Sequence, residues 1–218
     1  ALKKLAVGVA GLAERSSAQS FVVSCLGGDR EIRAKTCFIK ALLSEGVDVI
    51  NVGHVPTPIA HMATHNGTSS GAALILRRDT KDRLTLGALY NRKWVEEGFW
   101  QKITALSYEH VATSSNGRSI KLKLEDDYCD RLSADMAMAE NLRITVVCDS
   151  PITLSIAEQS LQKASCDVRS VCLERGFSES DAQAHFGGYD ADLHFVLNSC
   201  ASRLTVFDAH GNRVRDDH

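Results

Sequence analysis

The chain has 218 residues, a length that corresponds to one large domain or two small ones. Apolar residues make up 44% of it and charged residues 24%, which excludes a disordered chain and supplies enough apolar side chains for a packed core. With 25 basic and 27 acidic residues, the formal net charge is -2, so charge gives no reason to expect nucleic acid or an anionic membrane as a partner.

Cysteine usage and hydropathy point to a cytoplasmic protein. The seven cysteines occur singly among apolar neighbours, as in Val147-Cys148, which is typical of reduced, buried thiols. No apolar run approaches the roughly 18 residues that a membrane span needs, and no signal peptide opens the sequence. We therefore expect no membrane span, no disulfide framework and no cysteine-based zinc site.

Apolar periodicity and turn residues predict alternating strands and helices in the first part of the chain. Pro56-Thr57-Pro58 is a helix start, with Thr57 as the expected N-cap and Pro58 in the first helical position. The predicted helices cover residues 2–14, 30–45, 58–66 and 93–106, and the predicted strands cover 20–26, 47–52, 71–76 and 84–90.

The alternation pauses at a polar loop over residues 107–119 and then resumes. Alternating strands and helices predict an α/β fold with a largely parallel sheet, and we place a boundary between domains 1–140 and 141–218. The predicted elements after the loop are helices over 125–140 and 153–165 and strands over 143–148, 167–173, 191–197 and 203–208.

Four collinear segments resemble the α-D-phosphohexomutases, the phosphomannomutase/phosphoglucomutase family. The most distinctive is Gly46–Pro58, which ends in Val-Pro-Thr-Pro; Gly71–Asn91, Asp127–Ala139 and Asp190–Asp208 follow in the family's order. The resemblance implies two mixed α/β/α sandwich domains of about four strands each, like domains 1 and 2 of the four-domain family enzyme. Domains 3 and 4 have no counterpart in this sequence.

The resemblance places the family's phosphate-carrying serine in the segment Leu76–Lys81. Arg78 stands at the serine position and Asp79 at the position of the histidine that follows it. A guanidinium stays protonated and cannot carry a phosphoryl group as a covalent intermediate. The sequence therefore predicts no catalytic residue here, and Ser24–Gly28 likewise lacks the charged residues of the family's early Gly-Arg-Asp-x-Arg loop.

The family's magnesium loop has three aspartates at alternate positions, and the matching positions here are Asn198, Cys200 and Ser202. Hard cations such as Mg²⁺ need anionic oxygen ligands, and a thiol is a poor substitute. We therefore expect no Mg²⁺ and no other cofactor to bind.

Basic residues surround the former active loop, and two interpretations of them stay open. Arg77, Arg78 and Lys81, with Arg203 of the second domain, could bind a phosphorylated small molecule as an anion site. Alternatively, the loop is a solvated face on which Asp79 and Asp82 neutralise part of the charge.

These observations favour a pseudoenzyme with a regulatory, binding or assembly role, acting on an unknown protein partner or within a longer polypeptide. The alternative is a sugar-phosphate or nucleotide sensor. An active phosphohexomutase, or an enzyme of another reaction type on the same fold, ranks last because no nucleophile, base and orienting group converge in the sequence.

Overall fold

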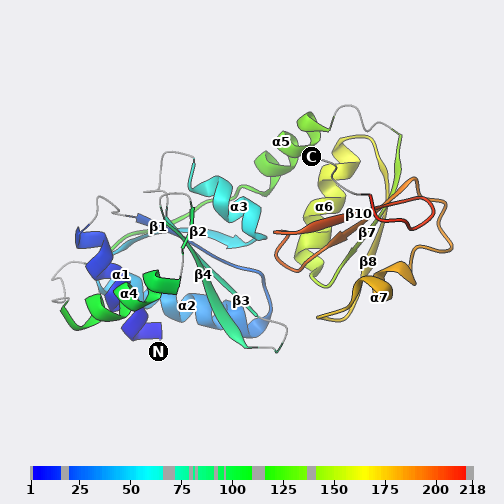
Figure 1. Cartoon of the computed structure of the whole chain (residues 1–218). Coiled ribbons are helices and arrows are strands. Elements are labelled where there is room, and N and C mark those ends of the chain that lie inside the picture. Colours follow the sequence, from blue (N-terminus) through cyan, green and yellow to red (C-terminus); the bar gives the residue numbers. More distant parts are fainter. Residues whose placement is uncertain are drawn as a thin grey trace. The chain divides into compact units, whose positions relative to one another are not determined.

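A computed structural model of the chain describes residues 2–15, 20–65, 72–78, 81, 83–90, 93–95, 97–109, 116–136 and 141–214. The chain divides into two compact units, Ala1–Val55 with Ile59–Leu124 and Pro56–Pro58 with Glu125–His218. Both combine a β-sheet with flanking helices, so the predicted α/β class and the mixed α/β/α sandwich are confirmed (Figure 1).

In the first part of the chain, helices and strands alternate as predicted. Its elements are α1 (Leu2–Arg15), β1 (Ser20–Cys25), α2 (Asp29–Ser44), β2 (Asp48–His54), α3 (Thr57–Ala63), β3 (Ala73–Arg78), β4 (Leu84–Tyr90), β5 (Lys93–Trp94), α4 (Glu97–Glu109) and β6 (Ser119–Lys121).

Within the described residues, the strands of the first unit form a six-stranded sheet of order β5-β4-β3-β1-β2-β6. The central strand β1 runs parallel to β2 and β3, whereas β4 is antiparallel to β3. Helices α1, α2 and α4 cover one face and α3 lies on the other (Figure 1). Because β1, β2 and β3 are parallel, their carboxyl ends meet at one edge of the sheet, where side chains from three strands come close together.

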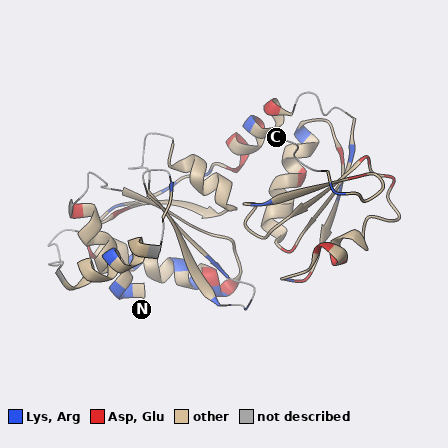
Figure 2. Cartoon of the chain, in the orientation of Figure 1, with Lys and Arg blue, Asp and Glu red and all other residues tan. Residues whose placement is uncertain are grey.

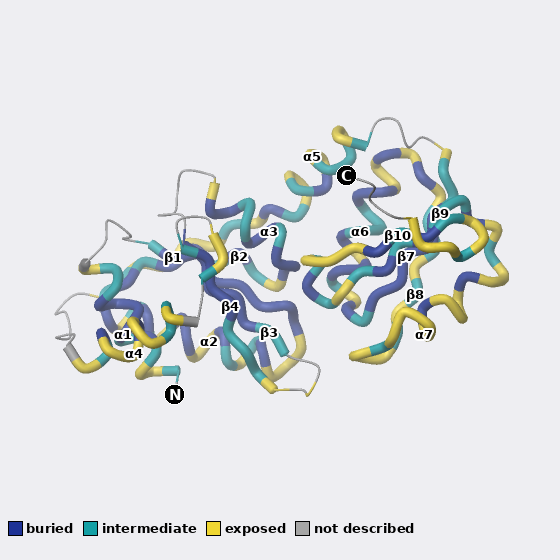
Figure 3. Tube along the Cα trace, viewed as in Figure 1, coloured by how far each residue is buried: buried dark blue, intermediate teal, exposed yellow. Residues whose placement is uncertain are grey.

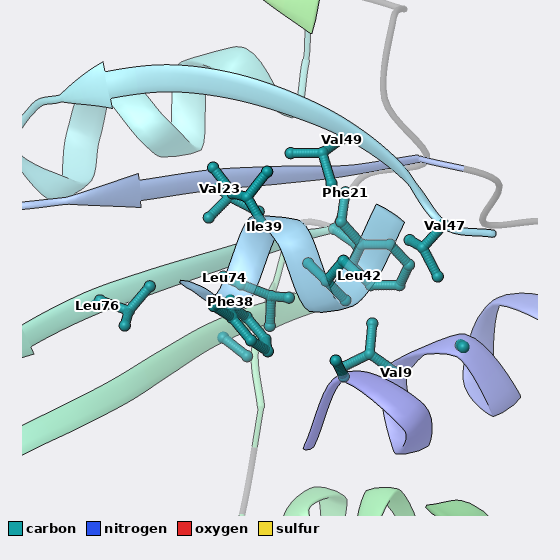
Figure 4. Packing of buried hydrophobic residues seen from close by; sticks show 14 of the residues in the cluster. Val9, Phe21, Val23, Phe38, Ile39, Leu42, Val47, Val49, Leu74 and Leu76 are labelled. Atoms are coloured by element: carbon teal, nitrogen blue, oxygen red, sulfur yellow. The ribbon is translucent and has the colours of Figure 1, made fainter. Parts of the chain in front are cut away.

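The core of the first unit lies between this sheet and α2. Figure 4 shows Phe38 and Leu42 of α2 against Phe21 of β1 and Leu74 of β3, with Val9 of α1 closing the cluster. Phe38 and Leu42 follow each other at helical spacing and are fully buried. This packing positions the first turn of α2 next to the carboxyl ends of the strands.

The second unit is smaller. Its elements are α5 (Glu125–Asp135), β7 (Arg143–Cys148), α6 (Pro151–Lys163), β8 (Asp167–Cys172), α7 (Glu179–Gln183), β9 (Leu193–Leu197) and β10 (Leu204–Asp208).

Its described strands form a four-stranded sheet of order β10-β9-β7-β8, with β10 antiparallel to β9 and the other pairs parallel. Ile144 and Val146 of β7 pack with Leu154 of α6, while Val147, on the opposite face of the strand, packs with Ala182 of α7. The two helices therefore cover opposite faces. Figure 3 shows the consequence: β7 is buried along almost its whole length, whereas β8 is an exposed edge strand.

The two units divide before α5, whereas the sequence analysis places the boundary after it, at residue 141. Helix α5 packs on α6: the Cys129 thiol donates to the Ile156 carbonyl at 3.8 Å, and Lys163 pairs with Asp130. Periodicity identifies a helix but does not show which unit it packs against, so the boundary from sequence is displaced by this one helix.

Four local features differ from the sequence prediction. The helix expected from Lys93 begins only at Glu97, because Lys93 and Trp94 pair with β4 as strand β5. Strand β6 lies inside the predicted loop and α7 was not predicted. Strands of two or three residues are too short to display a period of 2, and a five-residue helix is too short to display a period of 3.6. Thr57 does not cap α3: it is the first helical residue, and its buried Oγ1 has no hydrogen-bond partner among the described residues.

In the described part of the chain, no helix combines the length and apolar character needed to span a membrane.

Two helical glycines test the packing of α1 on α4. A Cβ on Gly8 of α1 would lie 2.1 Å from the Ile103 carbonyl oxygen, whereas a Cβ on Gly98 of α4 would have no neighbour within 4 Å. We expect Gly8→Ala to lower the free energy of unfolding by about 1–3 kcal/mol, because backbone must move. Gly98→Ala should be neutral or raise it by about 0.5 kcal/mol. Urea denaturation of both variants measures the difference, and equal stabilities would contradict the close approach of α1 to α4.

Candidate functional site

The carboxyl edge of the first sheet is the candidate site, because parallel strands and the start of α2 converge there. Strand β1 ends at Cys25, and the chain reaches α2 through Gly27 and Gly28, with φ of 95° and 93°. Such positive φ values favour glycine over residues with a Cβ. A Cβ on Gly28 would also lie 2.7 Å from Glu31 Oε2 and 2.8 Å from Arg78 Nη2. The two glycines therefore let the backbone pass directly beside these two charged side chains.

Arg78 and Glu31 form an ion pair at this edge. Arg78 Nε donates to Glu31 Oε1 at 2.7 Å. The Glu31 side chain is completely buried, whereas that of Arg78 is 23% exposed. Figure 2 shows basic residues at the end of β3 beside acidic residues at the start of α2. An isolated buried carboxylate is costly, so Arg78 supplies the charge that makes the burial of Glu31 tolerable.

Lys35 extends this polar network one helical turn further along α2. Its Nζ donates to the Gly53 carbonyl at 2.9 Å and to Asn51 Oδ1 at 3.2 Å, both at the end of β2. Burial lowers the pKa of Lys35, and Lys121 lowers it further, while Cys25 acts in the opposite direction. Burial also raises the pKa of the Cys25 thiol. Lys35 and Glu31 Oε1 thus bind groups within this edge, whereas the buried Glu31 Oε2 has no hydrogen-bond partner among the described residues.

Two of the basic residues predicted as an anion site, Arg77 and Arg78, do not point to the same place. Arg77 and Arg78 are consecutive on β3 and point to opposite faces: the Arg77 guanidinium lies 5.9 Å from the centre of the Trp94 ring, while Arg78 meets Glu31. Lys81 lies in the turn after β3, and Arg203 belongs to the second unit, next to β10. The predicted neutralising residues, Asp79 and Asp82, lie outside the described residues.

In the second unit, the three positions predicted as a degenerate metal loop do come together. Asn198 Oδ1 accepts the backbone N–H groups of Ser202 at 2.9 Å and Arg203 at 3.2 Å, and its Nδ2 donates to Ser202 Oγ at 3.0 Å. The Cys200 Sγ lies 3.0 Å from the same hydroxyl. The Asn198 side chain therefore joins the two ends of the loop by hydrogen bonds.

The loop is also anchored to the rest of the second unit. Thr153 Oγ1 of α6 donates to the Ser199 carbonyl at 2.6 Å, and the Cys148 thiol at the end of β7 donates to the Asn198 carbonyl at 3.6 Å. These contacts bind two backbone oxygens of the loop and hold it to α6 and β7. Its three side chains offer an amide, a thiol and a hydroxyl, a donor set that does not fit Mg²⁺. Within the described part of the chain, no three His, Cys, Asp or Glu side chains gather where they could hold a metal ion.

The sequence analysis missed Glu31 and Lys35, although a signal for them exists. Positions 31, 35, 38 and 42 form one buried face of α2, so two charged residues occupy the apolar stripe of an amphipathic helix. A charged residue on such a stripe predicts a buried ionic or hydrogen-bonded partner. That partner comes from β3, 47 residues away from Glu31 along the chain, and spacing alone does not identify it.

Comparisons with known proteins support the fold. No protein-family model matches the sequence, and no curated protein does. Among solved structures, a phosphoglucomutase/phosphomannomutase family protein from Burkholderia thailandensis superposes with a TM-score of 0.82 at 15% identity, covering 98% of this chain and 51% of that one. A "putative phosphomannomutase" from Thermus thermophilus gives a TM-score of 0.79 at 17% identity, covering 97% of this chain and 53% of that one.

The chain thus has the fold of phosphoglucomutase/phosphomannomutase family proteins, as the sequence resemblance predicts. It spans about half the length of the solved structures that it matches. At these identities the likeness concerns the fold, and what the site does has to be argued from its own residues.

The Arg78–Glu31 pair can be tested with a double-mutant cycle. Arg78→Met leaves the Glu31 carboxylate buried without this cation, and we expect the free energy of unfolding to fall by about 3 kcal/mol. Glu31→Leu combined with Arg78→Met removes both charges and should recover most of that loss. Urea denaturation of the two single variants and the double variant measures the coupling. Strictly additive losses would show that the two side chains do not depend on each other.

Proposed function

We propose that this chain is a non-catalytic module with a phosphohexomutase-like fold, whose role is binding, regulation or assembly rather than phosphoryl transfer. The observation that carries the proposal is the ion pair at the carboxyl edge of the first sheet. At the position that the family resemblance assigns to the phosphate-carrying serine, Arg78 holds a buried carboxylate instead.

Phosphoryl transfer needs a nucleophile that takes up the group and positive charge that neutralises it. Arg78 cannot take up a phosphoryl group, and its guanidinium already faces a carboxylate, which repels phosphate. The buried Glu31 adds negative charge where an incoming phosphoryl group would need positive charge. The lack of a nucleophile at Arg78 and the negative charge of Glu31 both oppose uptake of a phosphoryl group.

The loop Asn198–Arg203 supports the proposal independently. None of the three side chains at the expected metal positions is a carboxylate. The amide oxygen of Asn198 accepts hydrogen bonds from two backbone N–H groups. We propose that this loop binds no Mg²⁺, which would remove the cation on which the family's chemistry depends.

A phosphoryl-transfer assay tests the main proposal. We expect the 218-residue chain, and any longer native polypeptide that contains it, to show no conversion of glucose 1-phosphate above background with Mg²⁺ and glucose 1,6-bisphosphate. An active phosphoglucomutase serves as the positive control. Radiolabelled bisphosphate should leave no phosphate on the protein after acid quenching. Thr80 is the one residue with a hydroxyl group in the segment Leu76–Lys81. Turnover, or a phosphopeptide that contains Thr80, would overturn the proposal.

The loss of the metal site is tested by rebuilding it. The triple variant Asn198→Asp, Cys200→Asp, Ser202→Asp restores carboxylates at alternate positions, and we expect its Tm to rise by a few degrees, about 3 °C, on adding Mg²⁺. The native chain should show no such rise. NaCl at equal ionic strength controls for screening, because repulsion among the new carboxylates also weakens with salt. An equal Mg²⁺ response of the native chain and the variant would contradict the proposal.

A further inference from the structure

Two cysteines lie side by side at the carboxyl end of the second sheet. Strands β7 and β8 are parallel, and their register pairs Cys148 directly with Cys172. The register is held to the end of the strands, because the Leu173 backbone N–H donates to the Cys148 carbonyl at 2.9 Å. Neighbouring strands lie about 4.8 Å apart, and disulfides join Cα atoms about 4.4–6.8 Å apart. The backbone therefore already has the separation that a disulfide needs.

The two thiols also share a face of the sheet. Cys148 lies on the same face of β7 as Ile144 and Val146, which pack against α6. Val168 of β8 packs into the same cluster. Since side chains alternate along a strand, Cys172 lies on the same face as Val168. The Coulombic effect of Cys172 on the pKa of the Cys148 thiol is consistent with this proximity.

Their exposure differs, which assigns them different roles. Cys172 is exposed on the edge strand, whereas Cys148 is fully buried. Burial raises the pKa of Cys148 to about 12, so its thiolate is scarce near neutral pH. A soluble oxidant therefore meets Cys172 first, and Cys148 acts second.

We propose that Cys148 and Cys172 are a redox pair that forms a reversible intramolecular disulfide with a small-molecule disulfide such as oxidised glutathione. The Cys172 thiolate attacks one sulfur of the oxidant, forming a mixed disulfide and releasing one glutathione thiolate. The Cys148 thiolate then attacks the Cys172 sulfur and releases the second glutathione. The two protein thiols are oxidised, the oxidant is reduced to two thiols, and the two protons from the cysteines end on those thiols.

The resulting bond is expected to be easily reduced. Side chains at paired positions of parallel strands point the same way, so their Cβ atoms lie nearly as far apart as the strands, further than the roughly 3.8 Å usual in a disulfide. Strained or exposed disulfides have more oxidising potentials and are the labile ones. The pair is thus suited to switching rather than to permanent cross-linking.

Oxidation has a defined structural consequence in the second unit. The Cys148 thiol donates a hydrogen bond to the Asn198 carbonyl, and a disulfide sulfur has no proton to donate. Formation of the bond therefore releases one anchor of the loop Asn198–Arg203. The same carbonyl accepts the Ala201 N–H at 2.9 Å, so the effect reaches the turn itself.

The test is to equilibrate the folded chain with oxidised and reduced glutathione, quench it with acid, alkylate the free thiols and map the peptides by mass spectrometry. We expect a linked peptide containing Cys148 and Cys172 that reduced glutathione reverses. Cys172→Ser should lower its yield by about tenfold or more. Cys37, the other exposed cysteine, lies on α2 and provides the matched control: Cys37→Ser should leave the link unchanged.

The outcomes are distinguishable. Accumulation of glutathione on Cys172 without a Cys148 link would overturn the proposal, as would a link that forms only in urea. In the oxidised chain, hydrogen exchange at Ala201 and Ser202 should speed up by about threefold, while exchange in the first unit stays unchanged. An unchanged loop in a fully linked chain would refute the coupling to Asn198.

Discussion

A carboxylate that is fully buried at the end of parallel strands needs a cation within reach, and the carboxyl edge of the first sheet is organised around that requirement. Glu31 lies on the buried face of α2 that also carries Phe38, so packing of this face turns its charge inward. Arg78 meets it from β3, and Gly28 lets the backbone pass beside both. A neutral residue in place of Arg78 would leave the buried Glu31 carboxylate without this cation.

The loop of the second unit follows the same physical rule with neutral groups. An aspartate cage is stable only when a cation balances its charges, whereas the Asn198 amide satisfies two backbone N–H groups without one. Thr153 and Cys148 bind the loop carbonyls from α6 and β7. In both units, contacts within the protein occupy positions at which the family resemblance expects chemistry with a phosphate or an ion.

The fold was largely predictable because its long elements carry strong periodic signals. Helix α2 buries one face at a period of 3.6, β7 is a short run that is buried on both faces, and Gly46–Pro58 carried the family resemblance. Short elements such as β5 and β6 carry no period, so they were missed. The degenerate loop was predictable from three local positions, but the Arg78–Glu31 pair was not, because it joins residues 47 positions apart. Long-range polar pairs depend on packing that the sequence does not display.

Under the proposed non-catalytic role, no single substitution would supply the chemistry of the family. Serine in place of Arg78 would supply a hydroxyl, yet it would leave Glu31 buried without its cation and keep negative charge beside any incoming phosphate. One aspartate in place of Asn198 would supply one anionic ligand, too few to hold a hard cation against water. Each site is coupled to a partner within its own unit, so each would need at least two simultaneous changes.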